Sequence, residues 1–434
     1  MKKKLFFLFL GILSLKGFSQ TTKPETVSVI PTITAKEWDF NFYGFIRTDY
    51  IFDTRKSAQV REDNLNLYPL DKVLDANGAD LNDVSASNIL SIVSRVGLKI
   101  KGPNVWGAKM TGTLEGDFFG NTEASIGLVR LRHAYINMEW QKTSLLIGQT
   151  WYPAFIPEVF PGVANFNTGI MFNPFGWASQ IKLKQNFTKE LSFAATIYKE
   201  REFTTAAATG GTQNAASINS PLPTFHGQFQ FKNKNWLAGI GAEYKSLQPL
   251  TEYAPTIDTK AKTSEKVNST SFLGFVKYAN DKISIKTYGI TGGNMINFVM
   301  LGGFAGYSTP LNPEKYEAIK TSSFWIDVAS NNKKIAPALF FGYTKNQGDG
   351  RNGLAVGETV KYYNRGISNS RVIDNVWRLS GRVEFKHNNF KITPELEYTA
   401  AQWGDLDKNA NGKADLNLTT VGNFRTLLSC AYSF

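Results

Sequence analysis

Apolar and polar residues alternate with a period of two along many segments of this chain, each about ten residues long. In segment 375–386, "NVWRLSGRVEFK", Trp377 and Leu379 point to one face. Arg378 and Arg382 point to the other face. Because successive side chains of a strand point in opposite directions, this pattern predicts half-buried β-strands rather than helices.

The same alternation predicts about sixteen strands, separated by connections that are short and long in turn. The short connections are sequences such as "KGPN", "QK", "KNKN" and "HNN", and the long ones have about 6 to 35 residues. The strands are expected at residues 40–53, 89–101, 105–119, 126–140, 143–151, 177–187, 190–201, 224–232, 236–246, 268–279, 282–292, 321–330, 335–345, 374–387, 390–402 and 419–434.

This arrangement predicts an all-β fold, a transmembrane antiparallel β-barrel with short periplasmic turns and long external loops. Closure of the sheet removes every edge, which lipid would not tolerate open. A soluble sandwich array or propeller does not predict loops that are long only at alternate connections. Fourteen or eighteen strands remain alternatives, because strands are hard to delimit around "FVMLGGFAGYS".

The first residues have the composition of an export signal. Three lysines precede a mostly apolar stretch from Leu5 to Leu15 that is too short to span a bilayer, and small residues follow. We therefore predict a signal peptide at 1–19, a short periplasmic segment at 20–38 and the barrel at 39–434. Without the four lysines of the signal peptide the formal charge falls from +12 to about +8, so the basic excess persists.

The last residues, "SCAYSF", place Cys430, Tyr432 and Phe434 on one face of the final strand. A terminal Phe after alternating apolar residues resembles the assembly signal of outer-membrane barrels. Aromatic residues near strand ends, such as Trp38 and Trp236, suit the girdles at the lipid interfaces. These features predict the outer membrane of a Gram-negative bacterium, with its lipid as the surrounding medium.

The polar faces of the strands would line the lumen, and basic residues outnumber acidic ones there. Sixteen strands leave room for water, and rings of basic residues favour anions. The alternative is that these charges pair with one another and only hydrate the wall. The predicted lumen residues are Arg47, Asp49, Arg95, Lys99, Lys109, Glu115, Arg130, Arg132, Lys182, Lys184, Arg378, Arg382, Glu384 and Glu397.

Several motifs occur in an order that is similar to the DcaP-like trimeric porins: "GFIRTDYIFD", "SRVGLKIKGP", "GTLEGDFFG", "VRLRHAYINM" and "LLIGQTW". They cover about residues 43–151, and the later strands match only in pattern. The resemblance implies a homotrimer of sixteen-stranded barrels that passes small anionic solutes such as dicarboxylates. It also implies lumen roles for Arg47, Arg95, Arg130 and Arg132. Some members have a long helical N-terminal extension, whereas segment 20–38 is short and rich in Thr and Pro.

The long connection after the fifth strand, "YPAFIPEVFPGVANFNTGIMFNPFG", is apolar and almost uncharged. In sixteen-stranded general porins the loop at this position folds into the barrel and narrows it. By this resemblance residues 153–176 form a constriction loop; packing at a subunit interface is the alternative. The loop residues expected at the constriction are Phe155, Glu158, Phe160, Asn165 and Asn167.

Other chemistry in the sequence is weaker. Asp407, Asn409, Asn411 and Asp415 match positions of a calcium-binding loop, but Leu418 stands where a bidentate acid is needed. Calcium there is an alternative to a solvated turn, and no other cofactor is predicted. No catalytic constellation is visible, so we predict no enzyme, and nothing indicates nucleic acid. Strict alternation in "RLRHAY" places His133, with Val129, Leu131 and Tyr135, on the lipid or subunit face.

The sequence therefore predicts an outer-membrane porin, a water-filled diffusion channel with a preference for small anionic solutes. One alternative is a barrel subunit of a larger outer-membrane complex, whose long loops bind a partner protein. Another is a channel specific for phosphate or an oligosaccharide, although the predicted lumen faces contain few of the aromatic residues that an oligosaccharide would need.

Overall fold

The computed structural model describes residues 37–256, 258–368, 370–406 and 411–434. From Trp38 to Phe434 they form one compact unit. The predicted signal peptide and most of segment 20–38 lie outside the described residues. Among the described residues, twenty strands form the largest sheet. Four of them, β4, β17, β20 and β21, are short strands that pair with the wall or with one another at the loop end. The other sixteen build the wall of the barrel.

The wall is closed and antiparallel throughout. β1 pairs with β24 along one edge, where Phe45 is opposite Ser433, and with β5 along the other, where Asp39 is opposite Lys101. The wall strands are β1 (Asp39–Asp53), β5 (Arg95–Val105), β6 (Ala108–Asp117), β7 (Arg130–Glu139), β8 (Thr143–Trp151), β9 (Trp177–Asn186), β10 (Leu191–Tyr198), β11 (Thr224–Lys232), β12 (Trp236–Leu247), β15 (Val267–Ala279), β16 (Ile283–Gly293), β18 (Lys315–Ser330), β19 (Ile335–Gly348), β22 (Arg371–His387), β23 (Phe390–Leu406) and β24 (Ala414–Ser433).

The remaining elements belong to the long connections. They are β2 (Ser57–Val60), β3 (Leu65–Pro69), β4 (Ala86–Leu90), β13 (Glu252–Thr256), β14 (Thr259–Lys262), β17 (Gly302–Ser308), β20 (Thr359–Arg365), β21 (Ile367–Ser368), the helix α1 (Ala215–Asn219) and short 3-10 helices at Glu123–Ser125 and Ile296–Phe298. None of the helices in the described part of the chain has the length and apolar character to cross a membrane.

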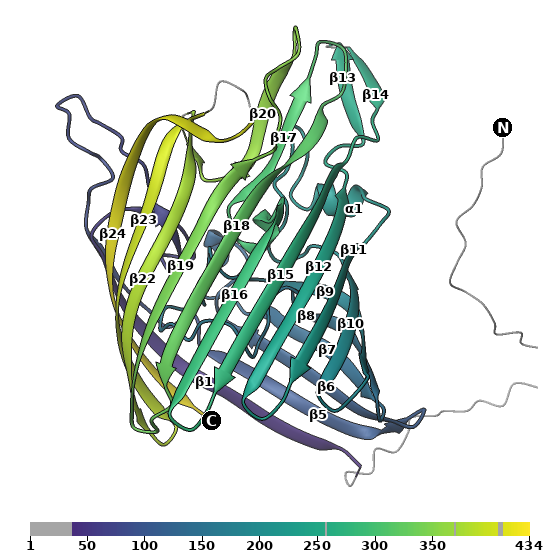
Figure 1. The fold of residues 1–434 in the computed structure, drawn as a ribbon, viewed down its shortest axis with the longest axis vertical. Coiled ribbons are helices and arrows are strands. Elements are labelled where there is room, and N and C mark those ends of the chain that lie inside the picture. The colour runs from purple at the N-terminus through teal and green to yellow at the C-terminus, as the bar shows by residue number, and fades with distance from the viewer. Residues whose placement is uncertain (1–36, 257, 369, 407–410) are drawn as a thin grey trace, which may run out of the picture. The chain divides into compact units, whose positions relative to one another are not determined.

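Tight turns connect the strands at one end of the barrel, and long loops connect them at the other end (Figure 1). Three of the turns use the same asparagine chemistry. Asn233, Asn280 and Asn332 each accept hydrogen bonds through Oδ1 from two backbone N–H groups of the following residues, at 2.8–3.1 Å. An asparagine side chain that mimics backbone in this way stabilises a reversal of the chain within a few residues.

The predicted sixteen-stranded barrel is confirmed, and each predicted strand has a counterpart in the wall. The differences lie at the loop end. β18, β19, β22, β23 and β24 extend several residues beyond their predicted bounds, because pairing continues there after the apolar alternation stops. The predicted strand 89–101 is divided into β4 and β5 by residues 91–94. The difficult segment "FVMLGGFAGYS" forms a 3-10 helix and β17, which pairs only with β18 and β20.

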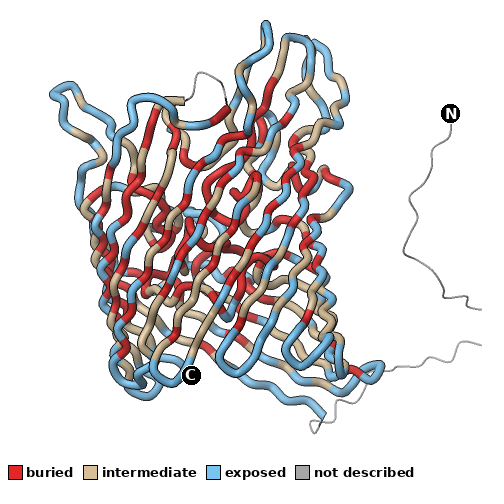
Figure 2. The backbone as a smooth tube through the Cα atoms, in the orientation of Figure 1, coloured by how far each residue is buried: buried red, intermediate tan, exposed pale blue. Residues whose placement is uncertain are grey.

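The outer face of the wall is apolar. Leu131, Leu339 and Ile240 are 48%, 63% and 66% exposed, as side chains that face lipid must be. Trp236 begins β12 and packs against Tyr278, with ring centroids 4.8 Å apart, near the turn end. Buried residues instead concentrate inside and across the middle of the barrel (Figure 2), where the loops that line the lumen lie.

Candidate functional site: the barrel lumen

The two arginines of β7, Arg130 and Arg132, point into the lumen against β6. Nε and Nη2 of Arg130 donate to the two carboxylate oxygens of Asp117, at 2.7 and 3.1 Å, and Nη1 donates to Glu202 at 2.7 Å. Arg132 donates to Glu115 at 2.8 Å and to Asp117 at 2.9 Å. Both arginines are at most 2% exposed. Buried charges of this kind are tolerated because each one is paired.

Aromatic rings cover the same arginines. The guanidinium carbon of Arg132 lies 4.4 Å from the ring centre of Trp177, and that of Arg130 lies 4.4 Å from that of Phe119. A planar guanidinium that is stacked and paired with carboxylates has little freedom and little contact with water. These two arginines are therefore part of the packed interior, with almost no exposed surface.

The sequence prediction for His133 was wrong. His133 is 8% exposed, and its Nε2 lies 3.7 Å from Oε1 of Glu115, a lumen acid. The register between β6 and β7 shifts between Glu115 and Gly116, so one extra residue of β7 is accommodated there. Such a bulge reverses the alternation that follows. Tyr135, also predicted to face lipid, consequently shares the His133 side, with ring centroids 6.2 Å apart; Leu131, before the bulge, faces outward as predicted.

The segment between β8 and β9 contacts lumen groups on the far side of the barrel. Nη1 of Arg378, in β22, donates to the carbonyl oxygen of Ile170 at 2.8 Å. The backbone N–H of Gly162 donates to Asp327 at 3.3 Å, and Asp327 also binds both terminal nitrogens of Arg382, at 2.9 and 3.2 Å. A Cβ on Gly162 would stand 2.6 Å from Nη2 of Arg382, so a larger residue here would displace the guanidinium from its present position.

Two further anchors hold the middle of the same segment. The carboxylate of Glu395, in β23, accepts hydrogen bonds from the backbone N–H groups of Ala164 and Asn165, at 2.7 and 3.3 Å. Nη2 of Arg47, in β1, donates to the carbonyl oxygen of Ala164 at 2.5 Å, while its Nε donates to Asp49 at 2.8 Å. The segment thus runs from β8 to β1 and β23 and returns to β9.

The five residues singled out in this segment lie in different surroundings. Phe155 stacks on Trp151, with ring centroids 4.0 Å apart, and lies 5.5 Å from Phe160. Glu158 is about half exposed and pairs with Lys232 of β11 at 2.6 Å. Asn165 and Asn167 are fully buried.

A second inward segment, which the sequence reasoning missed, is the first external loop. Leu65, Leu67 and Tyr68 are buried in the same apolar cluster as Met171 and Phe172. The apolar residues at 65, 67 and 68 in an otherwise polar loop are the sequence feature that could have indicated its inward position.

Polar contacts fix this first loop to the wall. The carbonyl oxygens of Asn66 and Leu67 accept hydrogen bonds from Nη2 of Arg378, at 3.1 and 3.2 Å. Nη1 of Arg425 donates to the carbonyl oxygen of Asp63 at 2.9 Å. The arginines of β22 and β24 therefore hold loop backbone as well as acids.

A third inward segment, 294–301, replaces the strand that was hard to delimit. Lys245 of β12 donates to the carbonyl oxygen of Asn294 at 2.6 Å and to Oδ1 of Asn297 at 2.7 Å. Glu200, beyond the end of β10, lies 3.9 Å from Lys245; burial raises the pKa of this carboxyl, and the ammonium of Lys245 opposes that rise. Phe298 packs against Tyr152, with ring centroids 5.3 Å apart, so this segment contacts the β8–β9 segment.

The lumen acids and lysines differ in their pairing. Glu397 lies 3.2 Å from Arg378, Arg95 lies 3.5 Å from Glu115, and Glu384 pairs with Lys386 and Lys391 at 2.7 and 2.8 Å. In contrast, six lumen lysines take part in no ion pair between described residues. Four of them were predicted from the sequence, and the other two, on β15 and β16, were not. The six lysines are Lys99, Lys109, Lys182, Lys184, Lys277 and Lys286.

The predicted calcium loop falls partly outside the described residues, which do not include Asp407 and Asn409. Oδ1 of Asn411 accepts a hydrogen bond from the backbone N–H of Lys413 at 3.0 Å. Among the residues that the structure describes, no group of three or more His, Cys, Asp or Glu side chains is placed to hold a metal ion.

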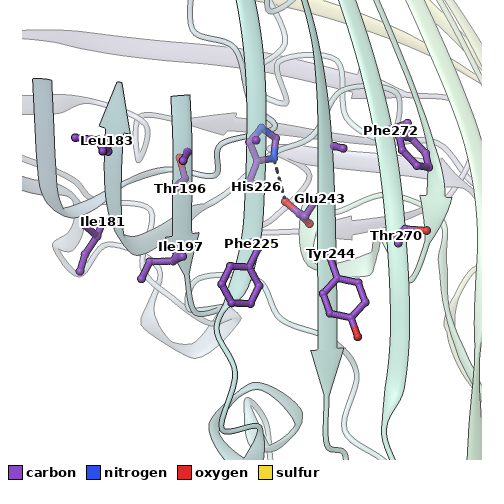
Figure 3. Close-up of a pocket in the computed structure, with 13 residues that line it drawn as sticks. Ile181, Leu183, Thr196, Ile197, Phe225, His226, Glu243, Tyr244, Thr270 and Phe272 are labelled. Atoms are coloured by element: carbon purple, nitrogen blue, oxygen red, sulfur yellow. Dashed lines mark ion pairs between the residues drawn. The ribbon is translucent and has the colours of Figure 1, made fainter. Parts of the chain in front are cut away.

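The outer wall also has a hollow, of about 600 Å³, across β9 to β15. Exposed apolar side chains such as Ile181, Phe225 and Phe272 border it (Figure 3). His226 and Glu243 of the same strands are buried, and Nδ1 of His226 lies 3.4 Å from Oε2 of Glu243. Because they alternate with the exposed residues, these two side chains belong to the lumen face of the wall.

Comparison with known proteins gives one family. Residues 14–298 match the family described as DcaP outer membrane protein. No curated protein matches the sequence.

Solved structures with the same fold cover almost the whole chain. The outer membrane channel DcaP of Acinetobacter baumannii has 16% sequence identity and a TM-score of 0.66, over 92% of this chain and 99% of that chain. An anion-selective porin from Comamonas acidovorans has 11% identity and a TM-score of 0.54, over 92% and 100% of the two chains. OmpT of Vibrio cholerae has 12% identity and a TM-score of 0.52, over 92% and 98%.

Proposed function

The chain belongs to the DcaP outer membrane protein family and is an outer-membrane porin of a Gram-negative bacterium, and we propose that its channel prefers small anionic solutes. A porin is a channel and not an enzyme, so its chemistry lies in which solutes the lumen favours. The proposed preference concerns the charges that a solute meets on its way through.

The proposal is based on a difference between the acids and the lysines of the lumen, because the predicted acids are paired with cations and six lysines are not paired with acids of the described residues. Each predicted lumen acid lies within 4 Å of a cation, as the pairs Asp49–Arg47, Glu115–Arg132 and Glu397–Arg378 illustrate. Six lysines on the lumen face, the ones named above, have no such acid among the described residues, unlike Lys232 and Lys245. Unpaired ammonium groups on low-dielectric walls raise the local concentration of anions.

The inward segments support the proposal by bringing solutes close to these lysines. We propose that residues 153–176 narrow the channel, since their backbone is anchored at Asp327, Arg378 and Glu395 on the far wall. Nζ of Lys286 donates to the carbonyl oxygen of Phe160 at 3.2 Å, at the edge of this segment. A solute that passes beside the loop would therefore move within reach of a cation.

The test is the reversal potential of single channels in a planar bilayer under a KCl gradient. We expect a potential of the sign that chloride permeation gives, and a substantial decrease in its magnitude when Lys182, Lys184 and Lys286 are all replaced by Gln. A matched control is Lys260→Gln, which removes an exposed lysine of the β13–β14 loop. A cation-selective wild type, or equal selectivity in the triple variant, would refute the proposal.

Among small anionic solutes, the family resemblance implies dicarboxylates as the class that the channel prefers. Lys182 and Lys184 lie two apart on β9, so both ammonium groups share the lumen face. Liposome swelling in succinate should be faster than in a neutral sugar of similar size. The control is the Lys182 and Lys184 double Gln variant, in which this difference should shrink; equal rates for both solutes in the wild type would exclude the preference.

We also propose a homotrimer, exported with cleavage after Ser19. The resemblance implies three barrels per assembly, and a neighbouring barrel or lipid chains would fill the apolar hollow of the β9–β15 wall. Native mass spectrometry in detergent should give three times the mass of one chain, and sequencing of the mature protein should begin at Gln20. A monomeric mass under conditions that preserve channel activity would contradict the trimer.

A further inference from the structure

A small cavity lies in the lumen between the inward segment and β9, β10 and β11. Its volume is about 160 Å³. The segment contributes Pro153 and residues 155–158 to one side, and the wall contributes lumen-facing side chains to the other. The two sides differ in chemistry, which restricts what the cavity can hold.

The wall side offers hydrogen-bond donors without partners. Lys182 lines the cavity and has no acid within 4 Å among the described residues. Thr196 is 3% exposed, and its hydroxyl has no hydrogen-bond partner in the described part of the chain. Buried polar groups are nearly always hydrogen-bonded, so a donor pair of this kind indicates a ligand or water in the cavity.

Two amides extend the polar side along β11. Gln228 and Gln230 line the cavity and are half-buried. Oε1 of Gln228 lies 3.4 Å from Nε2 of His226, so its NH₂ group remains free to donate. An ammonium, a hydroxyl and amide NH₂ groups together form a set of donors that suits a carboxylate.

The loop side is apolar. Pro153, Phe155, Ile156 and Pro157 line it, and the ring of Phe155 is held by its stack on Trp151. A cavity of about 150 Å³ with apolar walls accepts a ring of the size of benzene. The volume of about 160 Å³ therefore suits one carboxylate on a small apolar body.

One acid also borders the cavity, and its position restricts the charge of the ligand. Glu158 is paired with Lys232 at 2.6 Å, and both side chains are about half exposed, so the cavity meets lumen water there. The pair is neutral as a whole, and Lys182 leaves the site with one net positive charge. A second carboxylate on the ligand would find no free cation among the described residues on that side of the cavity, because Lys232 is already paired with Glu158.

We propose that this cavity is a binding site on the solute path for small monocarboxylates with an apolar body, such as a ring. The carboxylate binds Lys182, Thr196 and the glutamine amides, and the body packs against Phe155 and Pro157. The site rests on the proposed anion-preferring channel and adds to it: other anions pass by diffusion, whereas this class dwells and interrupts the ion current.

The experiment measures how benzoate blocks the KCl current of single channels in planar bilayers. In the wild type we expect concentration-dependent block, with weaker block by acetate, which lacks the body, and by terephthalate, which carries a second carboxylate. Lys182→Gln should raise the half-blocking concentration of benzoate about tenfold or more, because a charge-assisted hydrogen bond is lost. Thr196→Val, which keeps the shape, should raise it several-fold.

Lys184→Gln is the matched control, since Lys184 is a lumen lysine of the same strand that does not line the cavity. It should raise the half-blocking concentration of benzoate far less than Lys182→Gln does, because Lys184 acts on the anion only through the field of the lumen. Absence of block in the wild type, which would mean that the cavity holds water only, or an equal effect of the two lysine substitutions would overturn the site. Either result can coexist with an anion-selective reversal potential, so failure of the site and failure of the proposed function are distinguishable.

Discussion

Arginine and lysine occupy the lumen of this barrel in different ways. Arg130, Arg378 and Arg425 are each at most 2% exposed. Arg378 and Arg425 bind both acids and loop carbonyl groups, and Arg130 binds two acids. The planar guanidinium presents several donors at once, which suits this combination of partners. Lys99, Lys109, Lys182 and Lys286 remain without acids among the described residues, and an ammonium on a flexible stem stays hydrated. Arginines thus stabilise the interior, and lysines supply the free charge.

Arg130→Ala should therefore destabilise the barrel more than it changes selectivity. Removal of Arg130 leaves Asp117, which is 1% exposed, with Arg132 as its one remaining ion-pair partner among the described residues and leaves Glu202 without its 2.7 Å contact. Breaking a buried pair in this way costs about 3–5 kcal/mol. Urea unfolding in detergent, followed by tryptophan fluorescence, should show the loss of stability.

Lys184→Ala is the control for this prediction, because Lys184 is a half-buried lumen cation without an acid partner among the described residues. It should unfold at nearly the same urea concentration as the wild type. If the two variants unfold alike, Arg130 is not a structural residue, and its guanidinium must be counted among the charges that a solute meets.

Strand placement could be predicted from the sequence because lipid and water impose a period of two on each wall strand. Trp377 and Arg378 illustrate it: the first faces outward and the second is buried in the lumen. The bulge in β7 has no comparable local signal, so the inward positions of His133 and Tyr135 could not be predicted. Pairings between strands distant in the chain, such as Asp327 with Arg382, need the register, which the alternation does not contain.

Loops, rather than strands, determine how much of the lumen stays open. Three segments, around residues 57–69, 153–176 and 294–301, share one apolar cluster that includes Leu67, Met171 and Phe298. An apolar loop gains stability inside the barrel that it would lack in water. The composition of segment 153–176 made its position predictable by resemblance, whereas the other two were apparent only from their contacts.

Replacement of residues 158–171 by a short Gly-Ser linker should raise single-channel conductance roughly twofold or more, because the conductance of a pore follows its narrowest section. The same change removes Gly162 and Ala164 from their contacts with Asp327 and Glu395. Conductance in 1 M KCl is the measurement. An equal-length linker in the exposed β13–β14 loop, Glu252–Lys262, is the control and should leave conductance unchanged.

An unchanged conductance in the first variant would contradict the proposed narrowing. A decreased conductance would have the same meaning, provided that the variant still shows the heat-dependent gel shift of a folded barrel.

The whole barrel combines four predicted lumen acids that are each paired with a cation and lysines without acid partners among the described residues that are spread from β5 to β16. Lys99 and Lys109 lie on one side of the lumen, and Lys277 and Lys286 lie on β15 and β16. Such a distribution acts as a field over the cross-section, and no single contact defines it. Selectivity of this origin differs from that of a specific binding site in its dependence on salt.

Anion preference should therefore weaken as ionic strength rises. The Debye length decreases from about 10 Å at 0.1 M to about 3 Å at 1 M, so the lysines act on a passing ion only at short range in concentrated salt. Reversal potentials measured at a fixed KCl ratio should move toward zero between these concentrations. The reversal potential of the triple Gln variant at Lys182, Lys184 and Lys286 should be closer to zero at about 0.1 M and should change less between the two concentrations. A wild-type reversal potential that is independent of salt would indicate selection by a tight binding site instead of a field.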